Sequence, residues 1–73
     1  MATIGVKSEV AGTVWKIEKT VGEVVAEGEI IMILESMKME IPVHAPGAGR
    51  IVEIRVAPEE SVEEEQVLCS VEA

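Results

Sequence analysis

Apolar residues occur along the chain in short runs that alternate with turn-forming residues. The runs that predict strands are 4–8, 13–17, 30–36, 39–44, 50–56 and 67–71, with two shorter pieces at 24–25 and 61–62. Glycines and prolines stand between the runs. Strands at such close spacing, separated by turn residues, are typical of small β-sandwiches and barrels. The pattern therefore predicts an all-β protein.

The choice of apolar residues supports strands over helices. Val and Ile together number 20, Leu numbers 2, and Trp15 is the single aromatic residue. β-branched side chains fit strands and are slightly disfavoured in helices. We expect an aliphatic core with Trp15 inside it or plugging one end of the barrel. The stretch 58–65 is charged enough to form a helix, but the repeat described next argues against one.

The sequence repeats itself at an offset of 37 residues. Ala11-Gly12 matches Ala48-Gly49, and the apolar positions that follow stay in register up to Glu35 and Glu72. Each half reads strand, turn, short strand, turn, strand. The repeat predicts two small antiparallel sheets related by a quasi-twofold axis. Lys38 then lies at the junction of the halves, in a hairpin at the end of the molecule opposite the two termini.

Length and charge limit the classes of function. The 73 residues predict one domain, 1–73, with a formal net charge of −8 that comes from 14 acidic residues, all glutamates. Such a surface repels nucleic acid and anionic membranes. No apolar stretch approaches the roughly 20 residues of a membrane helix, and the first residues do not resemble a signal peptide. We expect a cytoplasmic location.

The chain lacks the residues of a catalytic centre. It has no aspartate, one histidine (His44) and one cysteine, Cys69, which we expect to be buried in the core. No nucleophile, base and acid are available as a set, and no metal site is expected. We therefore expect a protein that is not itself an enzyme.

The most informative segment is 30–43, in which two apolar strands flank a short polar break. We expect a tight hairpin with Met37 and Lys38 at its tip. Two-residue hairpin turns need positive φ, which Asn and Gly adopt easily and Met and Lys do not. A tip that ignores local preference indicates function. Of the two methionines, Met37 and Met39, one is expected to pack down while the other contacts a ligand.

The motif Glu35-Ser36-Met37-Lys38-Met39 resembles the biotin-attachment signature of the biotinyl/lipoyl family. The resemblance extends over the whole chain and implies a flattened barrel, or barrel-sandwich hybrid, of two four-stranded antiparallel sheets. It implies covalent biotin on Lys38, flanked by Met37 and Met39. Glu35, Ser36 and Glu40 are expected to form a recognition rim. The chain departs from the family where glycines usually precede the inner strands, because Glu59 and Glu65 stand there; other backbone conformations or strain at positive φ are expected.

The resemblance also implies a role. A carrier of this kind shuttles an activated carboxyl group between biotin carboxylase and carboxyltransferase sites, in a biotin-dependent carboxylase, decarboxylase or transcarboxylase. Its partners are biotin protein ligase and those two enzymes, and the isolated domain is expected to be a monomer. One alternative is lipoate on the same lysine, although lipoyl domains usually have Asp before the lysine and Ala after it. The other is a binding module that is never modified.

Overall fold

The computed structural model describes residues 2–73, and every regular element within them is a strand. The strands are β1 (Thr3–Lys7), β2 (Gly12–Ile17), β3 (Val24–Val25), β4 (Ile30–Ser36), β5 (Met39–His44), β6 (Gly49–Ile54), β7 (Ser61–Val62) and β8 (Val67–Glu72). Each predicted strand is present, with ends displaced by at most two residues. Residues 58–65 contain β7 and no helix, as the repeat predicts. None of the described residues forms a helix that could cross a membrane.

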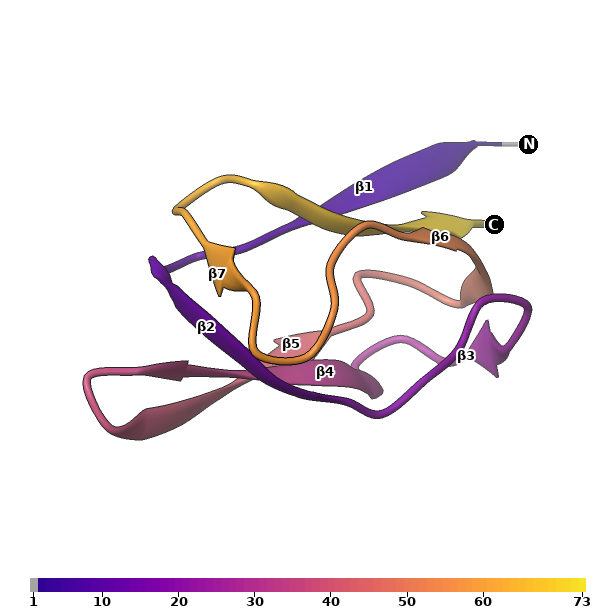
Figure 1. Ribbon diagram of the computed structural model, residues 1–73. Helices are drawn as coiled ribbons and strands as arrows, with labels where there is room; N and C mark the ends of the chain where they lie inside the picture. The colour runs from indigo at the N-terminus through magenta and orange to yellow at the C-terminus, as the bar shows by residue number, and fades with distance from the viewer. Residues whose placement is uncertain (1) are drawn as a thin grey trace.

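The strands form two antiparallel sheets that lie over one another (Figure 1). Sheet A has the order β1-β8-β6-β3, and sheet B has the order β5-β4-β2-β7. Each sheet takes two strands from each half of the sequence: β1 and β3 join β6 and β8 in sheet A, and β2 and β4 join β5 and β7 in sheet B, so the halves interlock. The predicted fold, a flattened barrel of two four-stranded sheets, is confirmed.

The internal repeat is present in the hydrogen-bond register. In sheet B Val14 pairs with Leu34, and in sheet A Ile51 pairs with Val71, each position displaced by 37. A β-bulge follows Val14 in β2, and another follows Ile51 in β6. Figure 1 shows the consequence for the ends: the β4–β5 hairpin projects at one end and both termini lie at the other.

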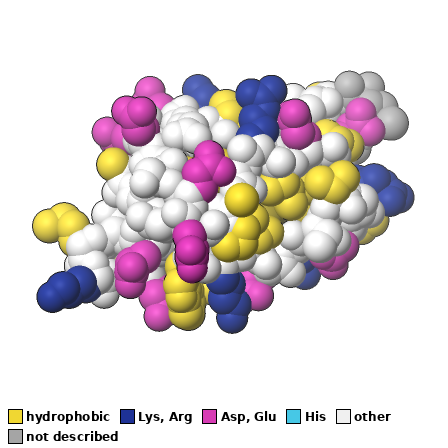
Figure 2. All heavy atoms as spheres, viewed as in Figure 1, with side chains coloured by type: hydrophobic (Ala, Val, Ile, Leu, Met, Phe, Trp, Pro, Cys, Tyr) yellow, Lys and Arg dark blue, Asp and Glu magenta, His cyan; other side chains and the backbone are white. Residues whose placement is uncertain are grey.

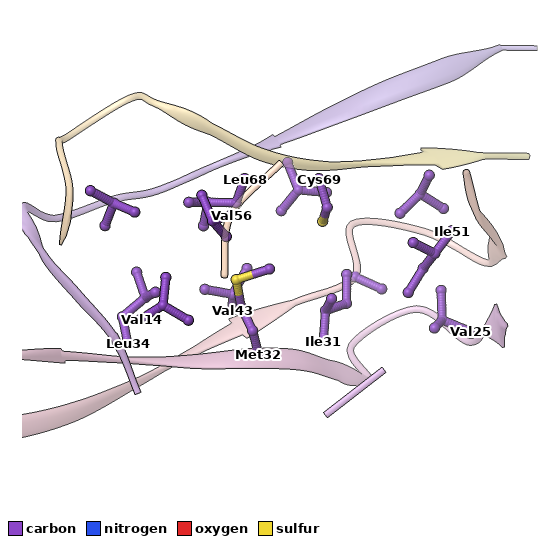
Figure 3. Packing of buried hydrophobic residues seen from close by; sticks show 14 residues of the cluster. Val14, Val25, Ile31, Met32, Leu34, Val43, Ile51, Val56, Leu68 and Cys69 are labelled. Carbon is purple, nitrogen blue, oxygen red and sulfur yellow. The ribbon is translucent and has the colours of Figure 1, made fainter. Parts of the chain in front are cut away.

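The core fills the space between the two sheets (Figure 3). Val14, Leu34 and Met32 point inward from sheet B toward Leu68 and Cys69 of sheet A, and all five side chains are fully buried. The prediction of a buried Cys69 is confirmed. Because burial disfavours the thiolate, it raises the pKa of the Cys69 thiol to about 11.

Four equivalent turns, two in each half, connect strands of the barrel. Their third residues, Gly22, Gly28, Glu59 and Glu65, all have positive φ, at 98°, 85°, 72° and 70°. In each turn a side chain at the fourth position accepts a hydrogen bond from the first residue's backbone N–H. Of the two predicted outcomes at Glu59 and Glu65, positive φ is the one found: the second half keeps the turn geometry of the first half without its glycines.

Trp15 lies outside the core, so the prediction that it fills the core or plugs the barrel is wrong. Its side chain is 47% exposed. Trp15 is the extra residue of the β2 bulge, since Val14 pairs with Leu34 and Lys16 with Ile33. The indole lies on the outer face of sheet B, where the Lys16 ammonium lies 5.4 Å from the ring centroid.

Candidate functional site

The β4–β5 hairpin ends in a two-residue turn formed by Met37 and Lys38. Ser36 pairs with Met39, so only these two residues lie outside the ladder. Their φ angles are 52° and 67°, which places both in the left-handed region that a primed turn requires. Left-handed backbone costs about 1–2 kcal/mol for each non-glycine residue. The turn therefore holds Met and Lys where Asn and Gly are favoured on conformational grounds.

Both methionines of the tip are exposed to solvent. Met37 is 91% exposed and Met39 is 65% exposed, so the prediction that one of them packs down is wrong. The core ends before the tip, because Leu34 is the last fully buried residue of β4 and Ile41 opposite it is only half-buried. Figure 2 shows an apolar and a basic side chain projecting from this end of the molecule. Two flexible apolar thioethers are thus available for contact with another molecule.

The Lys38 amine is exposed and makes no hydrogen bond or ion pair to any residue in the range 2–73. Two of the other three lysines, Lys16 and Lys19, are engaged. Lys19 donates to the Glu29 carboxylate at 2.8 Å, and that bond raises the pKa of Lys19. The same bond, followed by one from the Ala26 N–H, lowers the pKa of Glu29. Lys16 lies 3.6 Å from a carboxylate oxygen of Glu18.

Two glutamates face each other just below the tip. Glu35 of β4 and Glu40 of β5 are directly opposite, so their exposed side chains lie on one face of sheet B. Their third neighbour in the row is Thr13 of β2, which carries no charge. The structure therefore brings the two predicted acidic residues together beside Lys38. It does so although like charges directly opposite in a sheet are destabilising.

Ser36 has a partner inside the protein. Its hydroxyl donates to the carbonyl oxygen of Ala11 at 2.9 Å, which joins the hairpin to the loop before β2. Its predicted place in a recognition rim stays a prediction, but the hydroxyl proton is already used.

Sequence reasoning assigned no role at this site to Gly12. A Cβ atom at Gly12 would lie 2.4 Å from the Glu35 carbonyl oxygen and 3.2 Å from the Ser36 Cβ. Only glycine allows this approach of β2 to the hairpin. A Cβ atom at Gly49 would likewise lie 2.4 Å from the Glu72 carbonyl oxygen. The Ala-Gly pair shared by the two halves of the repeat was the available signal.

No group of three histidine, cysteine or glutamate side chains within residues 2–73 is arranged to hold a metal ion. The exposed features of the tip are an amine, two thioethers and two carboxylates. An unpaired amine on a rigid protruding turn is suited to covalent modification by another protein.

Known proteins share the sequence and the fold. The profile of the Biotin_lipoyl family, described as biotin-requiring enzyme, matches residues 1–71. The biotin/lipoyl attachment protein of Bacillus subtilis is 38% identical over 63 residues, which is 86% of each chain. The biotinylated protein TB7.3 homolog of Mycobacterium leprae is 36% identical over 52 residues, 71% of this chain and 73% of that one.

A solved structure agrees. The urea carboxylase of Kluyveromyces lactis superimposes with a TM-score of 0.92 at 28% identity, over 97% of this chain but only 6% of that enzyme. The small domain thus corresponds to one segment of a large enzyme.

Fold and family together define a carrier domain that is not itself catalytic. The chain belongs to the biotin/lipoyl attachment family.

Proposed function

We propose that Lys38 is the site of covalent biotin attachment and that the domain is a biotin carboxyl carrier. The observation on which this rests is the exposed, unpaired Lys38 amine, held between two exposed methionines at the tip of a strained turn. One relative is a biotinylated protein, and a urea carboxylase contains a segment with the same fold; both support biotin as the cofactor. The methionine on either side of the lysine supports biotin over lipoate.

The residues of the tip fit the steps of such a role. A lysine ammonium is not a nucleophile, so the biotin protein ligase has to remove a proton before the amine attacks the activated carboxyl carbon of biotin and displaces the activating group. The amide that forms joins the lysine side chain to the biotin tail. Together they make a tether of about ten single bonds, which spans roughly 12 Å. The cofactor then supplies the carboxyl-carrying chemistry and the protein supplies position.

The proposed partners follow from this role. The ligase modifies Lys38, and biotin carboxylase and carboxyltransferase then load and unload the carboxyl group. Because the tether spans only roughly 12 Å, we propose that movement of the whole domain covers the rest of the distance between the two active sites. We place the carrier in the cytoplasm, a reducing compartment in which the free thiol of Cys69 stays reduced.

Intact mass spectrometry of the protein from its native cells tests the cofactor. The expected result is one biotinyl addition, absent from a Lys38→Arg variant and present in a Lys7→Arg variant. Lys7 is a matched control because it is also exposed and lies on the edge strand β1. A lipoyl addition would show that the cofactor is lipoate and not biotin. An unmodified chain would indicate a binding module that is never modified. Avidin binding by Lys38→Arg would exclude Lys38.

The acidic residues next to the tip have a separate test. We propose that Glu35 and Glu40 are read by a basic surface of the ligase. Reversing both charges to lysine is expected to slow biotinylation and to weaken its dependence on salt. Reversal at Glu27 and Glu64, which are exposed, changes the net charge equally and is the control. Equal rates in the two double variants would remove this role.

A further inference from the structure

The internal repeat supplies a comparison between the two outer faces of the barrel. Residues displaced by 37 occupy equivalent positions, so the fold makes similar demands on both. On the outer face of sheet B, Lys16, Ile33 and Pro42 lie in one row across β2, β4 and β5. The equivalent row of sheet A consists of Glu53, Ser70 and Gly5.

The bulge residues differ in the same direction. Trp15 is the bulge residue on sheet B and Val52 is its equivalent on sheet A, and both are exposed, by 47% and 40%. Sheet B thus exposes an indole, an isoleucine edge and a proline where sheet A has valine, serine and glycine. The fold itself is satisfied by the smaller and more polar set, so the apolar set on sheet B has another cause.

The charges differ as well. In sheet B the row runs from the neutral Thr13 to Glu35 and then to Glu40, whereas the equivalent row of sheet A runs from Arg50 to Glu72 and then to Thr3. Sheet A therefore has one basic and one acidic residue in this row, and sheet B has two acidic residues and no basic one. The lower edge of the view in Figure 2, below β2 and β4, shows apolar, basic and acidic side chains next to one another. The outer face of sheet B combines an apolar centre with an acidic border.

We propose that Trp15, Ile33 and Pro42 form the surface on which the biotin protein ligase holds this chain; this inference rests on the function proposed above. On this proposal the ligase has an apolar pocket that receives the Trp15 indole, and basic side chains beside that pocket. Those basic groups complement Glu35 and Glu40. Trp is among the residues that most often dominate the binding energy of an interface.

Reach favours the ligase over the carboxylase partners. The ligase has to bring the Lys38 amine itself to the activated cofactor, so its surface closes around the hairpin. Ile33 and Pro42 lie five and four residues from Lys38, about 16 and 13 Å along their strands. A standard interface covers about 800 Å² on each partner, a disc of roughly 16 Å radius. A disc of that size that contains Lys38 near its border therefore also covers the apolar row. A carboxylase instead engages the far end of the biotin tether, roughly 12 Å beyond the Lys38 backbone, so its active site lies farther from the apolar row.

The test is the steady-state kinetics of biotinylation with purified ligase, using Trp15→Val, which installs the residue that the fold accepts at the equivalent position. We expect KM for the chain to rise about tenfold with kcat unchanged, because the lost contact is made equally before and during the reaction. The exchange variant Trp15→Val/Val52→Trp keeps the composition and moves the indole to sheet A. It is expected to have the same raised KM.

A second measurement is independent of any effect on folding. Hydroxyl-radical oxidation of Trp15 in the unaltered chain is expected to fall when ligase is added without biotin. In the exchange variant the relocated indole is expected to stay reactive. Thermal unfolding of all variants confirms that each one is folded.

Several outcomes would overturn the inference. An unchanged KM in Trp15→Val, a change confined to kcat, or recovery of KM in the exchange variant would each do so. Loss of a concentration-dependent dimer in Trp15→Val would assign the surface to a second copy instead. Reduced turnover with the carboxylase at an unchanged ligase KM would assign it to that enzyme. A wild-type chain that the ligase does not modify contradicts the proposed function itself, which separates the two failures.

Discussion

The hydroxyl of Ser36 donates to the carbonyl oxygen of Ala11 at 2.9 Å, across 25 residues of sequence. Ser36 is the last residue of β4, and the next two residues form the exposed turn with Lys38. Beyond the end of the core, this bond and the Thr13–Glu35 pairing are the contacts that connect the hairpin to the rest of sheet B. The direction in which Lys38 is presented depends on them.

Replacing Ser36 by alanine is expected to loosen the hairpin. The lost hydrogen bond lowers the free energy of unfolding by about 1 kcal/mol, measured by urea denaturation. If Lys38 is biotinylated, kcat/KM of the ligase is expected to fall about threefold, because the amine samples more orientations. Ser36→Thr keeps the hydroxyl and is expected to restore both values. Equal kinetics for the alanine and threonine variants would show that the bond does not position Lys38.

Met37→Asn is expected to separate stability from modification. Asn adopts positive φ more easily than Met, so the turn becomes more stable by about 0.5–1 kcal/mol. The variant loses the exposed thioether, and biotinylation by the ligase is expected to slow. Met37→Leu keeps an apolar side chain and is expected to retain most of the rate at unchanged stability. A Met37→Asn chain that is modified at the wild-type rate contradicts a contact role for Met37.

Glu59→Gly and Glu65→Gly are each expected to stabilise the fold. Their φ angles of 72° and 70° are strained for a residue with a Cβ, while glycine adopts them freely. The gain is offset by the greater freedom of glycine in the unfolded chain, which leaves about 0.5–1 kcal/mol in urea denaturation. Glu64→Gly removes the same charge at ordinary φ and is expected to destabilise. Stabilisation by all three substitutions would indicate charge relief instead.

Cys69 is expected to make stability fall between pH 9 and pH 11. The folded chain holds the thiol neutral because its pKa is raised to about 11, whereas the unfolded thiol ionises from about pH 9. The unfolded state then binds fewer protons, so this contribution is complete below pH 9 and is lost as pH rises to 11. It amounts to about 2–3 kcal/mol.

Cys69→Val isolates that contribution from the titration of the lysines. The variant keeps an apolar side chain in the core and has no thiol to ionise. Urea denaturation of both chains from pH 8 to 11 is expected to show a difference that grows above pH 9. Parallel curves over the whole range would place the Cys69 ionisation outside this window.

Much of the fold is predictable because each strand is short and is bounded by turn-forming residues. Alternating apolar positions identify the faces, and the 37-residue repeat fixes which strands are equivalent, as the pairs Val14–Leu34 and Ile51–Val71 show. The prediction for Trp15 was wrong because it relied on the size of the side chain and not on the alternation of inward and outward positions. Trp15 directly follows the buried Val14, so the alternation alone puts it on the outer face, and the bulge keeps it there.

The site is predictable in chemistry and less so in geometry. The motif around Lys38 identifies the exposed tip, and the turn preferences predict positive φ at Met37 and Lys38. The exposure of both methionines depends on where the core ends, which is a property of the packed sheets. The Ser36–Ala11 bond joins positions far apart in sequence, and no local pattern signals such a contact.

The two termini lie side by side, with the Ala73 N–H bonded to the Ala2 carbonyl oxygen at 3.0 Å, at the end of the molecule away from the hairpin (Figure 1). Anything joined there is separated from Lys38 by most of the 36 Å length of the domain. A small rotation of the domain about its termini therefore displaces Lys38 by a large distance. A domain that is immobilised or fused through its termini presents the lysine on the side away from the attachment.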